Sequence, residues 1–133
     1  MTRYLLDTNT ISDFIRHPRG PVADRIRKLG TAAVCTSIIV AAELRFGVEK
    51  RGSRKLAVRV AEALDIMEVL PFESPADAVY GVMRAKLEKA GRPIAANDLL
   101  IAAHAVSLGC TLVTDNERDF ARISGLSAEN WLP

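Results

Sequence analysis

Short apolar segments alternate with longer amphipathic segments along the chain. The apolar segments have the length of strands and are expected to be strands: Tyr4–Leu6, Ala33–Thr36, Met67–Leu70, Thr111–Thr114 and, with a less regular pattern, Leu126–Glu129. The amphipathic segments are expected to be helices: Thr10–Ile15, Pro21–Leu29, Ile38–Lys50, Lys55–Leu64, Pro75–Ala90 and Asn97–Leu108. Because strands covered on both faces are continuously apolar, this alternation predicts an α/β fold with a parallel sheet between helices.

Length and composition restrict the class of protein. No linker or repeat divides the 133 residues, so residues 1–133 are expected to form a single domain. Hydrophobic residues make up 49% and charged residues 26%, which is ordinary for a folded globular chain. No apolar run is long enough to span a membrane, and Asp7 interrupts any signal-peptide core, so a cytoplasmic location is expected. Cys35 and Cys110 are interpreted as buried free thiols rather than a disulfide.

Four acidic residues follow strands, begin helices or interrupt apolar segments. Asp7 follows the first predicted strand, Asp115 follows the strand ending at Thr114, and Asp98 opens an apolar helix. Glu43 lies in the middle of a helix whose first half has no polar face, so it is expected to be largely buried. Ionised carboxylates in apolar surroundings are unfavourable unless a cation or hydrogen-bond donors compensate them. Ligands of parallel sheets bind at the carboxyl ends of strands, where Asp7 and Asp115 are both expected.

Each aspartate also has a structural interpretation. Asp7 could cap the following helix, although other polar residues beside it could do so instead, and either Asn97 or Asp98 could cap the helix near residue 97. The residues after the fourth strand leave a choice, because Asp115, Asn116 and Asp119 are all candidates for the same site.

Four gathered carboxylates would need a counter-charge, and the absence of His or Cys at matched spacing favours a hard cation, Mg²⁺ or Mn²⁺. Such ions activate water for hydrolysis of phosphate esters. The chain has 18 basic and 16 acidic residues, so sequestering four acids would leave the remaining surface positive, as suits a polyanionic substrate.

These residues, in this order, resemble the PIN-domain ribonucleases and, within them, the VapC-type toxins of bacterial toxin–antitoxin modules. Three segments carry most of the resemblance: residues 5–9 (LLDTN), residues 37–47 (SIIVAAELRFG) and residues 94–105 (IAANDLLIAAHA). Residues 112–120 (LVTDNERDF), followed by Glu129-Asn130-Trp131, match the C-terminal part of the family. Any one of these motifs is weak, but the ordered set is specific and spans nearly the whole chain.

The resemblance implies a three-layer α/β/α sandwich with a parallel sheet of four or five strands. It also implies Mg²⁺- or Mn²⁺-dependent cleavage of RNA, with transfer RNA or another structured RNA as a plausible substrate. A homodimeric toxin and a VapB-like antitoxin partner follow from it as well. Carried over by position, Asp7, Glu43 and Asp98 match the three principal acids, and Asp115 or Asn116 matches the fourth. Thr8, Asn9 and Thr114 match polar positions that border the site or contact substrate.

Other residues are interpreted more conservatively. His104 is expected to be a satisfied, partly buried histidine and Trp131 to close the core. The basic run Lys50–Lys55 is interpreted as a solvated connection between two helices, with a contact to RNA as the less favoured alternative. Several apolar side chains are expected to leave exposed surface for a toxin dimer or an antitoxin: Ile11, Phe14, Ile15, Phe46 and Val48.

Two other functions compete with the ribonuclease. A response-regulator-like module would need a lysine after a late strand, and the last lysine of the chain is Lys89. A binding module with a degenerate site would bind RNA or protein without metal-dependent cleavage, which the joint presence of Asp7, Glu43 and Asp98 argues against.

Overall fold

The computed structural model describes residues 2–133, and its centre is a five-stranded parallel sheet in the order β3-β2-β1-β4-β5. The strands are β1 (Tyr4–Leu6), β2 (Val34–Ser37), β3 (Glu68–Leu70), β4 (Thr111–Val113) and β5 (Ala128–Glu129). All five strands predicted from the sequence are therefore present. The three inner strands β1, β2 and β4 carry Leu5, Val34 and Leu112 respectively, none of which has exposed surface.

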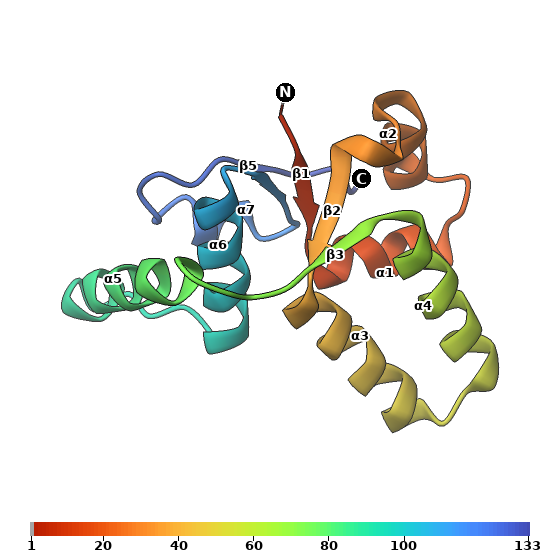
Figure 1. Ribbon diagram of the computed structural model, residues 1–133, viewed down its shortest axis with the longest axis horizontal. Helices are drawn as coiled ribbons and strands as arrows, with labels where there is room; N and C mark the ends of the chain where they lie inside the picture. The colour runs from red at the N-terminus through yellow and green to blue at the C-terminus, as the bar shows by residue number, and fades with distance from the viewer. Residues whose placement is uncertain (1) are drawn as a thin grey trace.

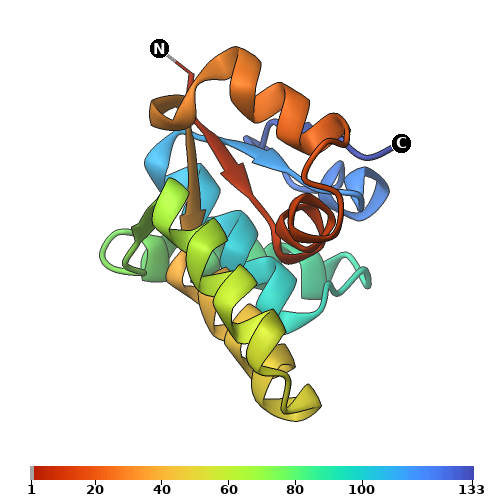
Figure 2. The same ribbon diagram turned by 90° about the vertical axis from the view of Figure 1, so that its right-hand side faces the viewer.

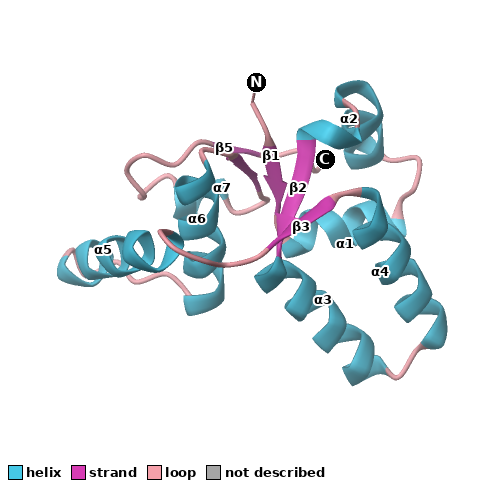
Figure 3. Ribbon diagram, in the orientation of Figure 1, coloured by secondary structure: helices cyan, strands magenta, loops and turns pink. Residues whose placement is uncertain are grey.

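Helices cover both sides of the sheet, as the α/β/α prediction requires; Figure 2 shows α2 and α6 on opposite sides of the strands, and Figure 3 separates helices from strands by colour. The helices are α1 (Thr8–Arg16), α2 (Pro21–Leu29), α3 (Ile38–Arg51), α4 (Arg54–Ile66), α5 (Ala76–Lys89), α6 (Ala96–Leu108) and α7 (Glu117–Phe120). The paired helices α3 and α4 project beyond the sheet, and α5 lies along the outside of α6 (Figure 1). A short 3-10 turn, η1 (Thr31–Ala33), precedes β2.

Most helix boundaries agree with the sequence pattern to within two residues, and two differences have physical reasons. Helix α1 begins at Thr8 rather than Thr10, because Asp7 itself is the N-cap. Helix α7 was not predicted, since its four residues are too few and too polar to give a periodic signal. No helix in residues 2–133 is long and apolar enough to cross a membrane.

The expected exposure of apolar side chains is only partly confirmed. Phe46 is 67% exposed on α3, whereas Ile11 has no exposed surface because α1 packs against α2, α3 and α4. Phe14, Ile15 and Val48 are half-buried against the core. The prediction of exposed apolar surface was therefore wrong for Ile11 and holds best for Phe46.

The C-terminal tryptophan closes the core, as expected. Trp131 is 4% exposed, its ring lies 5.3 Å from that of Tyr4 on β1, and the guanidinium of Arg25 lies 5.1 Å above it. Its indole Nε1 donates a hydrogen bond of 3.0 Å to Glu129 Oε1. These contacts fasten the end of the chain to the first strand and to α2.

Both cysteines are buried and free, as the sequence analysis expected. Their sulfur atoms lie 4.0 Å apart at the opposite end of the sheet from the carboxyl ends of the strands. The hydrogen bond between them raises the pKa of Cys35 and lowers that of Cys110 to about 7, and the nearby Arg3 guanidinium acts in the same direction on Cys110.

A buried hydrogen bond joins β2, α3 and α6. Ser37 ends β2 and caps α3, accepting a hydrogen bond of 3.0 Å from the backbone N–H of Ile39. The same hydroxyl lies 2.8 Å from His104 Nδ1, and both residues are almost completely buried. Burial lowers the pKa of His104, so the ring is neutral in the folded protein at pH 7. His104 is thus a satisfied core histidine, more deeply buried than the sequence suggested.

Candidate metal-dependent active site

The carboxyl ends of β1 and β4 bring Asp7 to the edge of a pocket. The backbone N–H of Asp7 donates to the carbonyl of Val113 at the end of β4, at 3.0 Å. Its carboxylate caps α1, with Oδ1 accepting a hydrogen bond of 2.9 Å from the backbone N–H of Thr10. The structural and functional interpretations of Asp7 are therefore compatible, because one carboxylate oxygen caps the helix while the side chain also lines the pocket.

The pocket has a volume of about 290 Å³ and collects most of the residues singled out from the sequence. It is lined by Asp7, Asn9, Asp98, Thr114, Asp115, Asn116 and Phe120. Asp7 follows β1, helix α1 supplies Asn9, α6 supplies Asp98, and the segment after β4 supplies the other four residues. Segments separated by about a hundred residues of sequence therefore converge here because β1 and β4 are neighbours in the sheet.

Asp98 lies in the first turn of α6, where the positive end of the helix dipole favours a carboxylate. The N-cap is Ala95, so neither Asn97 nor Asp98 caps the helix, and that structural interpretation was wrong. Asp98 therefore has no capping role that would account for its presence at this position.

Glu43 lies beside the pocket on α3 and is held by donors from two other helices. Its Oε1 accepts a hydrogen bond of 2.6 Å from the hydroxyl of Thr8, and its Oε2 accepts a longer one of 3.4 Å from Asn97 Nδ2. The expectation that Glu43 and the first half of α3 are largely buried was wrong, since Ile38 is 47% exposed and Glu43 itself is only half-buried. The role of Asn97 as a donor to Glu43 was not foreseen, because it depends on how α3 and α6 pack.

The three candidates after β4 differ in what they contact. Asn9 Nδ2 lies 3.3 Å from both carboxylate oxygens of Asp115. The amide of Asn116 instead donates at 2.9 Å to Asp119 Oδ2, and Arg122 donates at 2.5 Å to Asp119 Oδ1. These hydrogen bonds lower the pKa of Asp119. Among the residues that the structure describes, Asp115 therefore has no cationic partner, whereas Asp119 is neutralised by Arg122.

The electrostatics of the pocket are those of gathered, uncompensated carboxylates. Burial raises the pKa of Asp7, opposed by hydrogen bonds from Thr114 and Thr10. Burial also raises the pKa of Asp98, and the negative charges of Glu43 and Asp7 raise it further. The ionised forms are therefore disfavoured until a cation joins them.

The donor set fits a hard divalent cation. Asp7 and Asp98 face one pocket, every polar atom lining it is oxygen or amide nitrogen, and neither carboxylate has an ion pair in residues 2–133. Within the same residues, no three side chains of His, Cys, Asp or Glu are close enough to bind one ion together. Mg²⁺ suits such an arrangement, since proteins commonly hold it by one or two carboxylates together with waters and substrate phosphates.

Comparison with known proteins agrees with this geometry. Residues 4–126 match the PIN domain family. The chain is 36% identical to the tRNA(fMet)-specific endonuclease VapC of Salmonella typhimurium over 98% of this chain and 99% of that protein. It is also 36% identical to the ribonuclease VapC2 of Haemophilus influenzae, over 99% of this chain and 100% of that protein.

Solved structures agree at the level of the fold. The VapBC2 complex of Rickettsia felis, bound to a DNA fragment from its promoter, superposes with a TM-score of 0.89 at 34% identity, covering 98% of this chain and 99% of that one. The DNA-bound VapBC complex of Salmonella typhimurium gives a TM-score of 0.87 at 35% identity, covering 98% and 99%. The fold is thus shared with a class of nucleases, the PIN-domain ribonucleases. The chain belongs to the PIN-domain family and, within it, to the VapC ribonucleases.

Proposed function

We propose that the protein is a Mg²⁺- or Mn²⁺-dependent endoribonuclease that acts as the toxin of a toxin–antitoxin pair in the cytoplasm, with residues 1–133 as a single PIN domain. The observation that carries this proposal is the convergence of Asp7 and Asp98, both with raised pKa values, on one pocket that no basic residue of the described chain lines. The names of the relatives, which are ribonucleases, support RNA as the substrate, and one of them names a transfer RNA.

In this proposal Asp7 and Asp98 hold the metal, with Glu43 and Asp115 at the edges of the site. A divalent ion bound there would neutralise the scissile phosphate and lower the pKa of an attacking water. Thr8 fixes the orientation of Glu43 through its hydrogen bond of 2.6 Å, so this carboxylate can accept a proton from water at a defined position. Asn9 orients Asp115 in the same way. The hydrogen bond from Thr114 to Asp7 favours the ionised form of that carboxylate by lowering its pKa.

The contacts support Asp115 over Asn116 as the fourth member of the site. The amide of Asn116 is turned towards Asp119, and this side chain would have to release that hydrogen bond before it could serve as a ligand. Asp115 needs no such rearrangement, because within residues 2–133 its side chain is hydrogen-bonded only to the neutral Asn9.

The partners follow from the solved relatives. Those structures are complexes named VapBC. We therefore expect a VapB-like antitoxin to bind this chain, and a homodimer of the chain to form the toxin. The exposed Phe46 on α3 is an available apolar contact for either.

The test is to incubate the purified protein with total RNA and with transfer RNA, and to sequence the fragments. Cleavage at defined positions is expected with Mg²⁺ or Mn²⁺, and none is expected in EDTA. Binding of RNA without cleavage under any of these conditions would instead indicate a degenerate binding module. Mg²⁺ should also raise the melting temperature of the parent protein, because it binds the folded state alone.

The hydrogen bond from Thr8 to Glu43 gives a further prediction. Thr8→Val removes the donor at nearly constant volume, so the Glu43 carboxylate loses its fixed orientation and RNA cleavage should slow roughly tenfold. Thr8→Ser keeps the hydroxyl and should cleave at nearly the parent rate. The comparison requires rate constants for both variants at saturating Mg²⁺. Equal rates for Thr8→Val and Thr8→Ser would show that Glu43 does not depend on this contact.

A further inference from the structure

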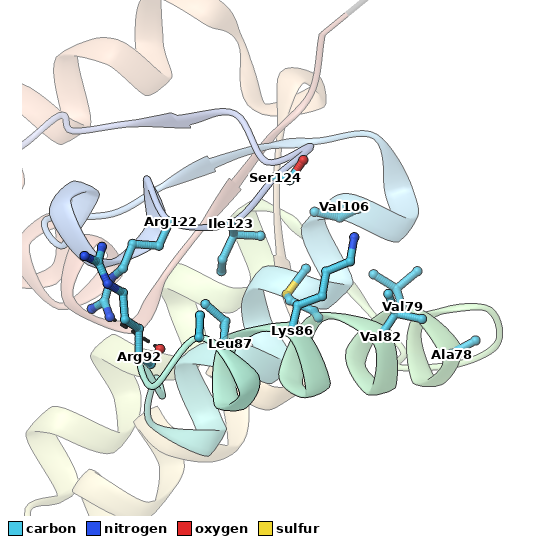
Figure 4. Close-up of a pocket in the computed structure, with 12 residues that line it drawn as sticks. Ala78, Val79, Val82, Lys86, Leu87, Arg92, Val106, Arg122, Ile123 and Ser124 are labelled. Carbon is cyan, nitrogen blue, oxygen red and sulfur yellow. Dashed lines mark hydrogen bonds between the residues drawn. The ribbon is translucent and has the colours of Figure 1, made fainter.

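An apolar groove with one basic end lies along α5, outside the acidic pocket. Its volume is about 690 Å³, and its walls come from α5, from the end of α6 and from residues 122–124 (Figure 4). Val82 is 59% exposed on its wall, and Met83 and Ile123 form its floor. A volume of this size accommodates small-molecule ligands, for which sites span roughly 300–1,000 Å³.

The charges along the groove have one sign. Among the described residues that line it, Lys86, Arg92 and Arg122 are basic and none is acidic. Arg122 NH1 lies 3.4 Å from the backbone carbonyl of Arg92, so two guanidinium groups gather at one end, as Figure 4 shows. Cations beside an apolar surface match the chemistry of a nucleic acid strand, whose phosphates are anionic and whose bases have apolar faces.

The groove is connected to the acidic pocket by two hydrogen bonds. Arg122, which lines the groove, donates to Asp119, and Asp119 accepts from Asn116, which lines the pocket. The segment after β4 contributes to both cavities, with Phe120 at the pocket and Ile123 at the groove. A strand cut at the pocket would therefore reach the groove within a short distance of the cut.

We propose that this groove binds the RNA strand next to the cleavage position, with Lys86 and Arg92 contacting phosphates and Val82 and Met83 packing against a base. The inference rests on the proposed ribonuclease function and adds a substrate-binding subsite to it. The sulfur of Met83 suits the edge of an aromatic base. A second copy of this chain fits less well, because a symmetric contact would bring Lys86 and Arg92 of one copy next to the same two cations of the other.

The test measures RNA affinity separately from cleavage. A short fluorescein-labelled single-stranded RNA of mixed sequence is titrated in EDTA at several salt concentrations, and its anisotropy gives Kd. Lys86→Gln should lower the slope of log affinity against log salt by about 0.7, the value for one lost phosphate contact on a single strand. Lys89→Gln, on the same helix but outside the groove, should leave the slope unchanged.

A second pair of variants, one in the groove and one control, tests the apolar wall of the groove. Val82→Asp should weaken RNA binding roughly tenfold, because a charged group replaces the surface that packs against the base. Val58→Asp is the control, since Val58 is exposed to a similar degree, 56%, on the distant helix α4. In cleavage assays Val82→Asp should raise KM with kcat unchanged.

Parent-like affinity of Val82→Asp and a parent-like salt slope of Lys86→Gln would overturn the inference. It is also overturned if Val82→Asp changes only the oligomeric mass, or only the binding of an antitoxin, while RNA binding persists. If the parent binds RNA through this groove but never cleaves it, the groove stands and the proposed nuclease function fails.

Discussion

Replacing Asp98 with asparagine should abolish RNA cleavage and raise the melting temperature of the metal-free protein. The loss of cleavage is expected to reach at least about a hundredfold, because charge stabilisation by a bound metal contributes several kcal/mol. The gain in stability follows from the removal of a half-buried carboxylate that the charges of Glu43 and Asp7 oppose. Because Asp98 is partly exposed, this gain should be small, about 1 kcal/mol.

The stability gain should depend on pH in a defined direction. The folded-state pKa of Asp98 is raised, so the ionised carboxylate disfavours folding above that pKa. As pH falls through the folded-state pKa towards the lower unfolded value, the parent protein takes up the proton and recovers this stability. The difference in melting temperature between Asp98→Asn and the parent, measured in EDTA, should therefore be largest near neutral pH. It should disappear in acid, where the parent carboxylate is protonated.

Two controls separate this effect from a general loss of negative charge. Asp65→Asn removes one acid from the exposed end of α4 and should change neither cleavage nor the melting temperature noticeably. Mg²⁺ should raise the melting temperature of the parent and of Asp65→Asn more than that of Asp98→Asn. Unchanged cleavage by Asp98→Asn would remove this residue from the site.

The role of Asp7 in cleavage can be separated from its role as the N-cap of α1. Asp7→Asn retains a side-chain oxygen for the backbone N–H of Thr10, so the fold should persist while cleavage is lost. Asp7→Ala should lose cleavage and, in addition, about 1 kcal/mol of stability with the cap. Thermal melts of the two variants distinguish the capping contribution from the chemical one.

Ser37→Ala should be among the most destabilising small substitutions, lowering the free energy of unfolding by about 2–3 kcal/mol. It removes the N-cap of α3 and leaves the buried Nδ1 of His104 without its partner. The matched control is Ser53→Ala, which removes only a cap, the hydrogen bond of 3.1 Å to the backbone N–H of Leu56 at the start of α4. That substitution should lower the free energy by about 1 kcal/mol.

Urea denaturation of the two variants gives the comparison directly. If Ser37→Ala and Ser53→Ala are equally destabilising, the hydrogen bond to His104 contributes nothing beyond the cap. A larger loss for Ser37→Ala would also predict weaker Mg²⁺ binding, because Ser37 and His104 join the two helices that carry Glu43 and Asp98.

The strands and the long helices could be predicted from the sequence because each has its own local pattern. The segment Thr111–Val113 is continuously apolar and buried, and the amphipathic segment at residues 76–89 forms α5. The burial of Ile11 could not be predicted in this way, since it depends on three helices that pack over α1. Local pattern therefore determines the elements, while their contacts depend on packing.

The candidate site also combines residues that could be predicted from the sequence with contacts that depend on packing. Strand ends alone predicted a common edge of the sheet for Asp7 and Asp115, and the family resemblance added Asp98, which lines the same pocket as both. The choice between Asp115 and Asn116 required side-chain directions, which Asn9 and Asp119 determine. The basic groove was not foreseen, since Arg92 and Arg122 are thirty residues apart and meet only through the packing of their loops.

The position of Trp131 makes the docking of the C-terminus directly observable. It is the one tryptophan of the sequence, and in the folded protein it is buried against Tyr4 and Arg25. Its fluorescence emission will therefore shift towards longer wavelength when the last strand leaves the sheet. Stopped-flow fluorescence of the unmodified protein then gives the rate at which the last strand joins the sheet during refolding. This rate can be compared with the rate of helix formation measured by circular dichroism.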